Sequence, residues 1–115
     1  MDYSSQRNKT IILKGKGKVH QIAIEDIVYV ECESYVSTFH TFGKGKTVSC
    51  SILLKDIEEK VNGYGFYRIN RNTLVNLKYF DSYVSGKKRC FKTTTGVEMN
   101  VSRRKWCILK EYIQE

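Results

Sequence analysis

The stretch that decides the fold lies at residues 66–77 and reads Phe66-Tyr67-Arg68-Ile69-Asn70-Arg71-Asn72-Thr73-Leu74-Val75-Asn76-Leu77. Its two ends, residues 66–69 and 74–77, are rich in the apolar and β-branched side chains that strands favour. The centre is polar and holds asparagines, which favour turns because their side chains hydrogen-bond to nearby backbone. The stretch therefore predicts a polar turn presented by two strands.

Other short extended runs lie on both sides of this stretch. They cover residues 10–14, 19–23, 27–31, 35–42, 46–51, 80–85, 90–95 and 97–101. Glycine-lysine turn signals separate several of them, at residues 15–17, 43–45 and 86–88. Closely spaced turns favour antiparallel pairing over the long crossovers of a parallel sheet.

Two segments have helical periodicity instead. Leu53, Leu54, Ile57 and Val61 lie at helical spacing, and Ser51 is the expected N-cap. A final helix is expected after Ser102, with apolar positions at Trp106, Leu109, Tyr112 and Ile113. The predicted fold class is therefore mainly β, with antiparallel strands, one short internal helix and a C-terminal helix.

Length and charge limit the function classes. The chain has 115 residues, which suits one domain over residues 1–115, with residues 1–9 expected to form a flexible arm. Twenty Lys and Arg against twelve Asp and Glu give a net charge of +8, which favours a polyanionic partner. The charge is segregated: residues 61–97 hold seven basic residues and one acid, whereas residues 21–42 hold four acids and no Lys or Arg.

The sequence also predicts the compartment and the absence of cofactors. No apolar run approaches the roughly 18–20 residues of a membrane span, and the polar start has no signal core, so a cytoplasmic protein is expected. The four cysteines form no CxxC pair and have no metal-ligand spacing to the histidines. We expect small buried thiols, no metal and no other cofactor.

The start of the final helix carries an unusual run of cations. Arg103, Arg104 and Lys105 fill its first turn, where positive charge opposes the helix dipole at a cost of about 0.3–1 kcal/mol each. An anion bound at this terminus would explain the run, because the free N–H groups, the dipole and the cations would all face it. The alternative is that the three side chains extend into solvent at little cost.

The polar turn of residues 68–73 suits base-edge reading. Arginine pairs with guanine O6 and N7, and asparagine pairs with adenine N6 and N7. In the alternative, Asn70 and Asn72 bond their own backbone. Both interpretations can hold together, with Asn72 as the structural asparagine and Arg71 free to reach out. A third segment, residues 33–37, offers Ser and Tyr hydroxyls for phosphate contacts. Glu31 and Glu33 would repel DNA there, so we expect them to pair with Lys or Arg within the fold.

Several of these motifs, in this order, resemble the LytTR family of bacterial DNA-binding domains. The resemblance runs roughly from Ile11 to Ile113 and rests on residues 27–31, 34–36, 66–72, 74–77 and 101–104. Its most specific pieces are Phe-x-Arg-Ile-x-Arg with the following Val-Asn, and the late Val-Ser-Arg-Arg. The chain departs from the family at Asn70 and Asn72, where members often carry His and Ser.

The resemblance implies a mainly β fold of small antiparallel sheets in an elongated single domain. It also implies a bacterial transcriptional regulator that inserts loops, rather than a recognition helix, into successive major grooves of double-stranded DNA. It implies a stand-alone regulator or the output domain of a two-component response regulator, binding at tandem direct repeats with possible self-association on DNA. The family's base-contacting positions fall on Ser37, Arg71 and Arg104. Its backbone-contacting positions fall on Ser34, Asn72, Ser102, Arg103 and Lys105.

Three other functions would need different features in the sequence. An OB-like β-barrel for single-stranded DNA or RNA would use the eight Tyr, five Phe and one Trp as stacking platforms. An enzyme such as a small nuclease needs clustered carboxylates, and the acids here lie away from the basic stretches, so no enzymatic activity is expected. A membrane-surface role needs a helix with a basic face along its length, which neither predicted helix has.

Overall fold

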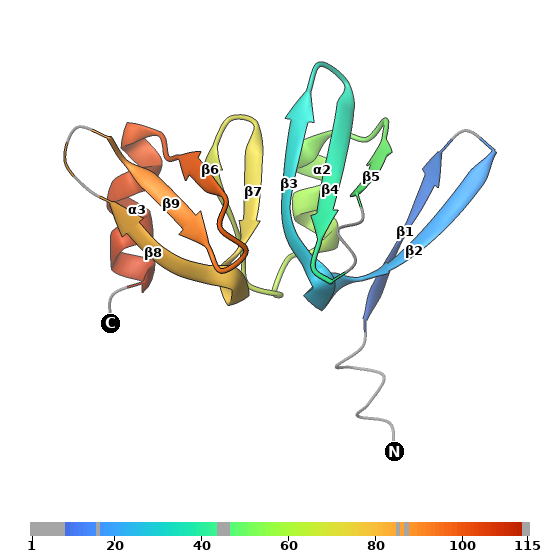
Figure 1. Cartoon of the computed structure of the whole chain (residues 1–115). Helices are drawn as coiled ribbons and strands as arrows, with labels where there is room; N and C mark the ends of the chain where they lie inside the picture. Colours follow the sequence, from blue (N-terminus) through green and yellow to red (C-terminus); the bar gives the residue numbers. More distant parts are fainter. Residues whose placement is uncertain (1–8, 16, 44–46, 85, 87, 114–115) are drawn as a thin grey trace.

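The stretch at residues 66–77 forms the antiparallel strands β6 (Phe66–Asn70) and β7 (Thr73–Asn76) in a computed structural model of the chain. The structure describes residues 9–15, 17–43, 47–84, 86 and 88–113. Strand β7 also pairs with β3 (Ile27–Glu33), which is followed by β4 (Val36–Thr41) and β5 (Thr47–Cys50). Together they make a five-stranded sheet in the order β5-β4-β3-β7-β6 (Figure 1).

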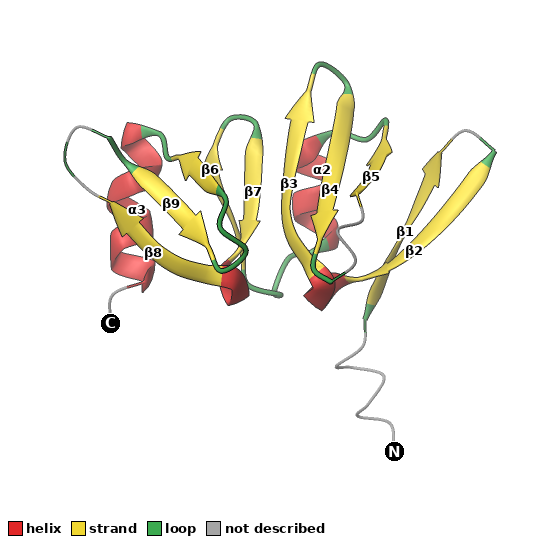
Figure 2. Cartoon of the chain, in the orientation of Figure 1, coloured by secondary structure: helices red, strands yellow, loops and turns green. Residues whose placement is uncertain are grey.

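Two smaller antiparallel sheets flank the central one. Strands β1 (Thr10–Gly15) and β2 (Lys18–Ala23) form a hairpin on one side. Strands β8 (Phe80–Val84), β9 (Cys90–Thr93) and β10 (Glu98–Asn100) form a three-stranded sheet on the other side (Figure 2). Short 3₁₀ turns, Ile24–Asp26 and Leu77–Tyr79, lead from β2 to β3 and from β7 to β8. The predicted class of small antiparallel sheets with two helices is confirmed.

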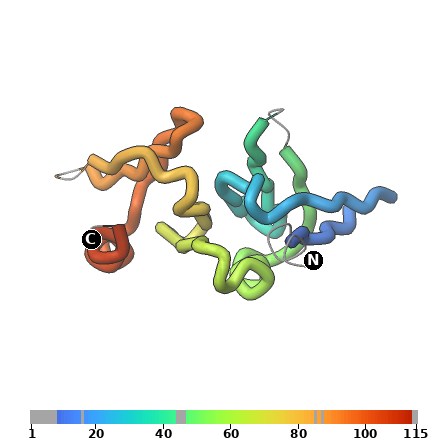
Figure 3. Tube along the Cα trace, turned by 90° about the horizontal axis from the view of Figure 1, so that it is seen from below, coloured from blue at the N-terminus to red at the C-terminus, as the bar shows by residue number. Residues whose placement is uncertain are grey.

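The two α-helices cover the sheets from the same side. These are helix α2 (Leu54–Lys60) and helix α3 (Arg103–Ile113). In Figure 3, which turns the molecule by 90°, both helices lie on one side of the strands, at the bottom of the view. The predicted cap of α2 is wrong: the N-cap residue is Leu53, without a side-chain cap hydrogen bond, and Ser51 lies upstream of it. The principal extents of 44 × 39 × 25 Å show that the molecule is flattened rather than rod-like.

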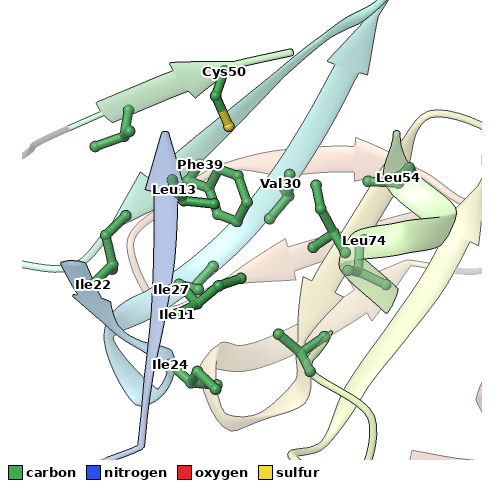
Figure 4. Close-up of a cluster of buried hydrophobic side chains, with 13 residues drawn as sticks. Ile11, Leu13, Ile22, Ile24, Ile27, Val30, Phe39, Cys50, Leu54 and Leu74 are labelled. Carbon is green, nitrogen blue, oxygen red and sulfur yellow. The ribbon is translucent and has the colours of Figure 1, made fainter. Parts of the chain in front are cut away.

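Strand β7 is shared between two hydrophobic cores, and all four of its residues are buried. Successive side chains of a strand point to opposite faces, so Leu74 packs into one core and Val75 into the other. The first core joins β1–β5 to α2 and includes Phe39, Val30 and Leu54 (Figure 4). The second core joins β6 and β9 to α3. It contains Ile69, Val75, Phe91, Val101, Trp106 and Leu109.

A buried asparagine at the end of β7 joins the central sheet to the turn that follows. Asn76 is only 2% exposed. Its Nδ2 donates to the carbonyl of Ile27 at 2.8 Å, and its Oδ1 accepts from the backbone N–H of Lys78 at 3.0 Å. Both polar ends of the side chain are therefore satisfied inside the protein. The Val-Asn motif has a structural role here.

Of the predicted N-terminal arm, residues 1–8 lie outside the described residues. Lys9 already belongs to the fold, because its carbonyl accepts a hydrogen bond of 2.9 Å from the N–H of Ile24. No helix in the described part of the chain is long and apolar enough to cross a membrane.

Candidate nucleic-acid interface

Three chain segments predicted to contact DNA come together at one edge of the molecule. Glu31 of β3 pairs with Thr73 of β7, so the β3–β4 turn at residues 34–35 and the β6–β7 turn at residues 71–72 lie at the same edge. Helix α3 begins at this edge too, and all three segments lie along the top of the molecule in Figure 1. We call this the upper edge.

Backbone and side-chain hydrogen bonds join the three segments. The N–H of Cys32, near the end of β3, donates to the carbonyl of Asn72 at 2.8 Å. The Nδ2 of Asn70 donates to the carbonyl of Asn100 at 2.8 Å, which ties the β6–β7 turn to β10. The N–H of Ser102 donates to the carbonyl of Ile69 at 2.9 Å. The turns and the helix start therefore form one connected surface.

Asn70 is the side chain that organises the β6–β7 turn. Its Oδ1 accepts from the N–H of Asn72 at 2.8 Å, while its Nδ2 reaches Asn100. The sequence interpretation that made Asn72 the structural asparagine is wrong, because Asn70 has this role and Asn72 is exposed. The asparagine-rich turn indicated the bond between Asn70 and the backbone of Asn72. Nothing near Asn70 in the sequence indicated its second partner, Asn100, which lies 30 residues away.

The two arginines of this turn have different roles. Arg68 is a positioning residue: its Nη2 donates to the carbonyl of Arg71 at 2.7 Å, and its Nη1 pairs with Glu58 of α2 at 3.1 Å. Arg71 is exposed at the tip, and its guanidinium has no partner among the described residues. One arginine therefore holds the turn, and the other is free to bind a ligand.

The start of α3 has the predicted cap and cations. The N–H of Lys105 donates to Ser102 Oγ at 3.4 Å, as expected of an N-cap serine. Arg103 and Arg104 are exposed. Lys105 is half-buried, with its ammonium group 5.7 Å from the centre of the Tyr67 ring. The Tyr67 hydroxyl donates to the carbonyl of Lys105 at 3.3 Å, so this tyrosine fixes the first turn against β6.

Burial raises the pKa of Tyr67 above its ordinary value, and the neighbouring Tyr112 adds to the rise. Tyr67 therefore remains protonated at neutral pH and keeps its hydrogen bond to the helix. The ring of Tyr112 meets that of Tyr67 edge-on, with the centroids 5.7 Å apart.

An open groove of about 780 Å³ runs between the turn and the helix start. Its basic lining residues are Arg71, Lys88 and Arg89, and its acidic lining residues are Glu31 and Glu33. The expectation that Glu31 pairs with Lys or Arg is wrong: it binds His40 Nε2 at 3.0 Å. No ion pair to Glu33 is found among the described residues.

Ser37 does not lie in the turn, and its predicted base contact is corrected. It belongs to β4, is 0% exposed, and donates from Oγ to the carbonyl of Ile52 at 2.6 Å. Its side chain points to the same face as buried Phe39, two residues on. A base cannot reach it. Ser34, the neighbouring predicted contact, is exposed in the turn with φ of +59°.

Comparison with known proteins identifies the fold family. The family model of the LytTr DNA-binding domain matches residues 17–114. The chain belongs to the LytTR family of DNA-binding domains. Its general function is therefore to bind DNA in transcription regulation.

A solved structure has the same fold as this LytTR domain. It is described as the LytTr DNA-binding domain of a putative methyl-accepting/DNA response regulator from Bacillus cereus, and it matches with a TM-score of 0.77 at 14% identity. The match covers 92% of this chain and 97% of the other. A search of curated proteins found no match.

Proposed function

We propose that this LytTR domain binds double-stranded DNA sequence-specifically by placing the turns of its upper edge in the major groove. The observation that carries the proposal is that exposed Arg71 and the cationic start of α3 share one edge and are joined by hydrogen bonds through Asn70 and Ser102. Phosphate contacts would hold the domain in place, and the turn would read base edges.

The contacts divide by chemistry and position. We assign base contacts to Arg71 and Arg104, which are exposed fork-shaped donors. We assign backbone contacts to Ser34, Asn72, Ser102, Arg103 and Lys105, which all lie at the upper edge. In the cell, the domain would be cytoplasmic and act in a bacterial transcriptional regulator, either alone or as the output part of a two-component response regulator. The response-regulator description of the Bacillus cereus structure supports the second possibility.

A competition experiment tests the proposal against a single-strand binder. The described strands form three open sheets rather than one closed barrel, and the large aromatics Phe39, Phe91 and Trp106 are buried in the cores. We therefore expect a duplex selected from random DNA to displace a bound labelled duplex, and its separated strands to compete at least about tenfold more weakly. Equal competition by the single strands would favour the OB-like alternative. Cleavage of the bound duplex with added magnesium would contradict a role without catalysis.

The proposal extends to tandem direct repeats. Two domains on one face of the duplex require repeat centres near a whole number of helical turns, about 10–10.5 bp or a multiple of it. Inserting about 5 bp between the repeats turns the second site to the opposite face. We expect the cooperativity of joint occupancy, measured by footprinting over a range of protein concentrations, to be lost while each repeat still binds on its own. Cooperativity that survives the insertion would contradict contact between neighbouring domains.

Removing a base-contacting arginine should weaken binding and relax specificity together. Arg71→Ala and Arg104→Ala are each expected to cost about 1–3 kcal/mol on the preferred duplex and to flatten the preference at one or two base pairs. The measurement is binding to a panel of single-base variants of the site, beside a thermal melt of each protein.

Lys60→Ala is the matched control for those arginines, because it removes one exposed charge from the end of α2, away from the upper edge. It should leave the base preferences unchanged. If Arg71→Ala unfolds the domain, or weakens binding to every sequence equally, its assignment as a base-reading residue is wrong.

A further inference from the structure

The most exposed large apolar side chain in the described part of the chain lies at the upper edge. Tyr35, in the β3–β4 turn, is 77% exposed, and the adjacent Val36 is 43% exposed. Exposed aromatics are costly to leave in water, and an apolar tip on the edge that also carries the exposed cations Arg71, Arg103 and Arg104 indicates a contact with something that is anionic and locally apolar. Double-stranded DNA has both properties.

The turn that carries Tyr35 extends beyond the rest of the upper edge. The β3–β7 ladder ends at the pair Glu31–Thr73, whereas the β3–β4 ladder continues to Glu33–Val36. Two further residues of strand reach roughly 7 Å, at about 3.3 Å per residue. Figure 1 accordingly shows the β3–β4 turn rising above the β6–β7 turn. Tyr35 is therefore placed to enter a groove more deeply than Arg71.

The turn is also held in a defined conformation. Ser34 has φ of +59°, a left-handed backbone that non-glycine residues seldom adopt. The Sγ of Cys32 donates to the carbonyl of Ser34 at 3.6 Å, and the backbone N–H of Cys32 donates to the carbonyl of Asn72. The backbone that carries Tyr35 is thus fixed relative to the turn that carries Arg71.

We propose that Tyr35 is a further specificity-determining residue, whose ring packs against the 5-methyl group of a thymine in the major groove. The inference rests on the proposed function and names a second mode of readout at the same edge. The thymine methyl is the one apolar group on the major-groove base edges, and it is absent from the minor groove. The exposed ring of Tyr35 is complementary to it, whereas Arg71, on the neighbouring turn of the upper edge, would read a nearby guanine.

The test replaces thymine by uracil in the selected duplex, one position at a time. Uracil lacks only the methyl group, so the hydrogen-bonding pattern of the base pair is unchanged. For the wild-type domain we expect one or two replacements to weaken binding about fourfold, the fold-change that corresponds to about 0.8 kcal/mol for one buried methyl group. For Tyr35→Ala the same replacements should have no further effect.

Two more variants separate the effect of the Tyr35 ring from that of its hydroxyl and from that of exposed tyrosines elsewhere. Tyr35→Phe keeps the ring and should retain the uracil effect. Tyr64→Ala removes an exposed tyrosine before β6, away from the upper edge, and should bind like the wild type. Thermal melts should show that all three variants are folded. Selection with Tyr35→Ala should also lose the thymine preference at the affected positions.

Three results would overturn the inference. One is a uracil effect that persists in Tyr35→Ala; another is a loss in Tyr35→Phe as large as in Tyr35→Ala, which would assign a phosphate contact to the hydroxyl. The third is a preferred site with no thymine that responds to replacement. In each of these cases the wild-type domain still binds the duplex and the proposed function stands. If the wild-type domain binds no duplex at all, the proposed function fails, and the inference fails with it.

Discussion

Raising the salt concentration from about 50 mM to about 200 mM is expected to weaken binding of the domain to its duplex by about 500-fold. Each neutralised phosphate contributes a slope of about −0.9 to the log–log plot of affinity against salt, and about five contacts give about −4.5. The backbone-contacting cations Arg103 and Lys105, together with Lys88 and Arg89 of the groove lining, can supply most of these contacts. Titrations at several salt concentrations measure the slope directly.

One variant assigns part of that salt dependence to a single residue. Arg103→Ala removes an exposed backbone-contacting cation and should make the slope shallower by about 0.9, with about equal weakening on every sequence. Its removal should not destabilise the free domain, because a cation in the first helical turn opposes the helix dipole. Binding that does not change with salt would contradict the upper edge as a phosphate-binding surface.

Replacing Asn76 by alanine is expected to lower the free energy of unfolding by about 2–4 kcal/mol. The substitution leaves the buried Ile27 carbonyl without this hydrogen bond, at a cost of about 1–3 kcal/mol, and removes the part-buried bond to the Lys78 N–H, which contributes about 0.5–1.5 kcal/mol. Ile27 itself is 0% exposed, so water cannot take over the bond. Urea unfolding followed by circular dichroism measures the change.

Asn62→Ala is the matched control. Asn62 is exposed just after α2, and the substitution should change the free energy of unfolding by less than about 0.5 kcal/mol. At low temperature, the folded fraction of Asn76→Ala should still bind DNA, because the side chain lies inside the protein rather than at the upper edge. An Asn76→Ala domain as stable as the control would show that the two side-chain hydrogen bonds of Asn76 do not stabilise the folded domain.

The strands and helices could be predicted because their signals are local. A run rich in Val, Ile and Tyr marked β3, alternating apolar residues marked β4, and helical spacing marked α2 and α3. The cap at Ser102 followed from residue type alone. The prediction of Ser51 as a cap was wrong because α2 begins later, at Leu54. A polar residue near the start of a helical pattern does not by itself show where the first turn begins.

The site was predicted less completely, for a physical reason that Ser37 illustrates. A resemblance placed it in a loop, whereas the period-two pattern placed residues 35–42 in a strand. The strand interpretation was the correct one, because Ser37 shares its face with Phe39. The turn before Ser37 has only two residues between the strands. It depends on the left-handed backbone of Ser34, a conformation that the residue type serine does not predict.

The roles of Asn70 and Glu31 depend on contacts that no local pattern contains. Asn70 reaches across to Asn100, and Glu31 binds His40, whose ring stacks on Tyr29 with the centroids 4.2 Å apart. Such partners become known only when the register of the sheets is known. The sequence could therefore indicate which residue types gather at the upper edge, but not which of them hold it together.

The hydrogen bonds that join the turns to the start of α3 have a thermodynamic consequence for recognition. Segments already fixed in their bound arrangement lose little conformational entropy when the ligand arrives, so more of the contact free energy appears as affinity. A substitution such as Asn70→Ala would lower affinity without deleting a contact to DNA, because the freed turn would have to be ordered on binding. Two side-chain hydrogen bonds within the protein thereby set part of the strength with which its surface holds a partner.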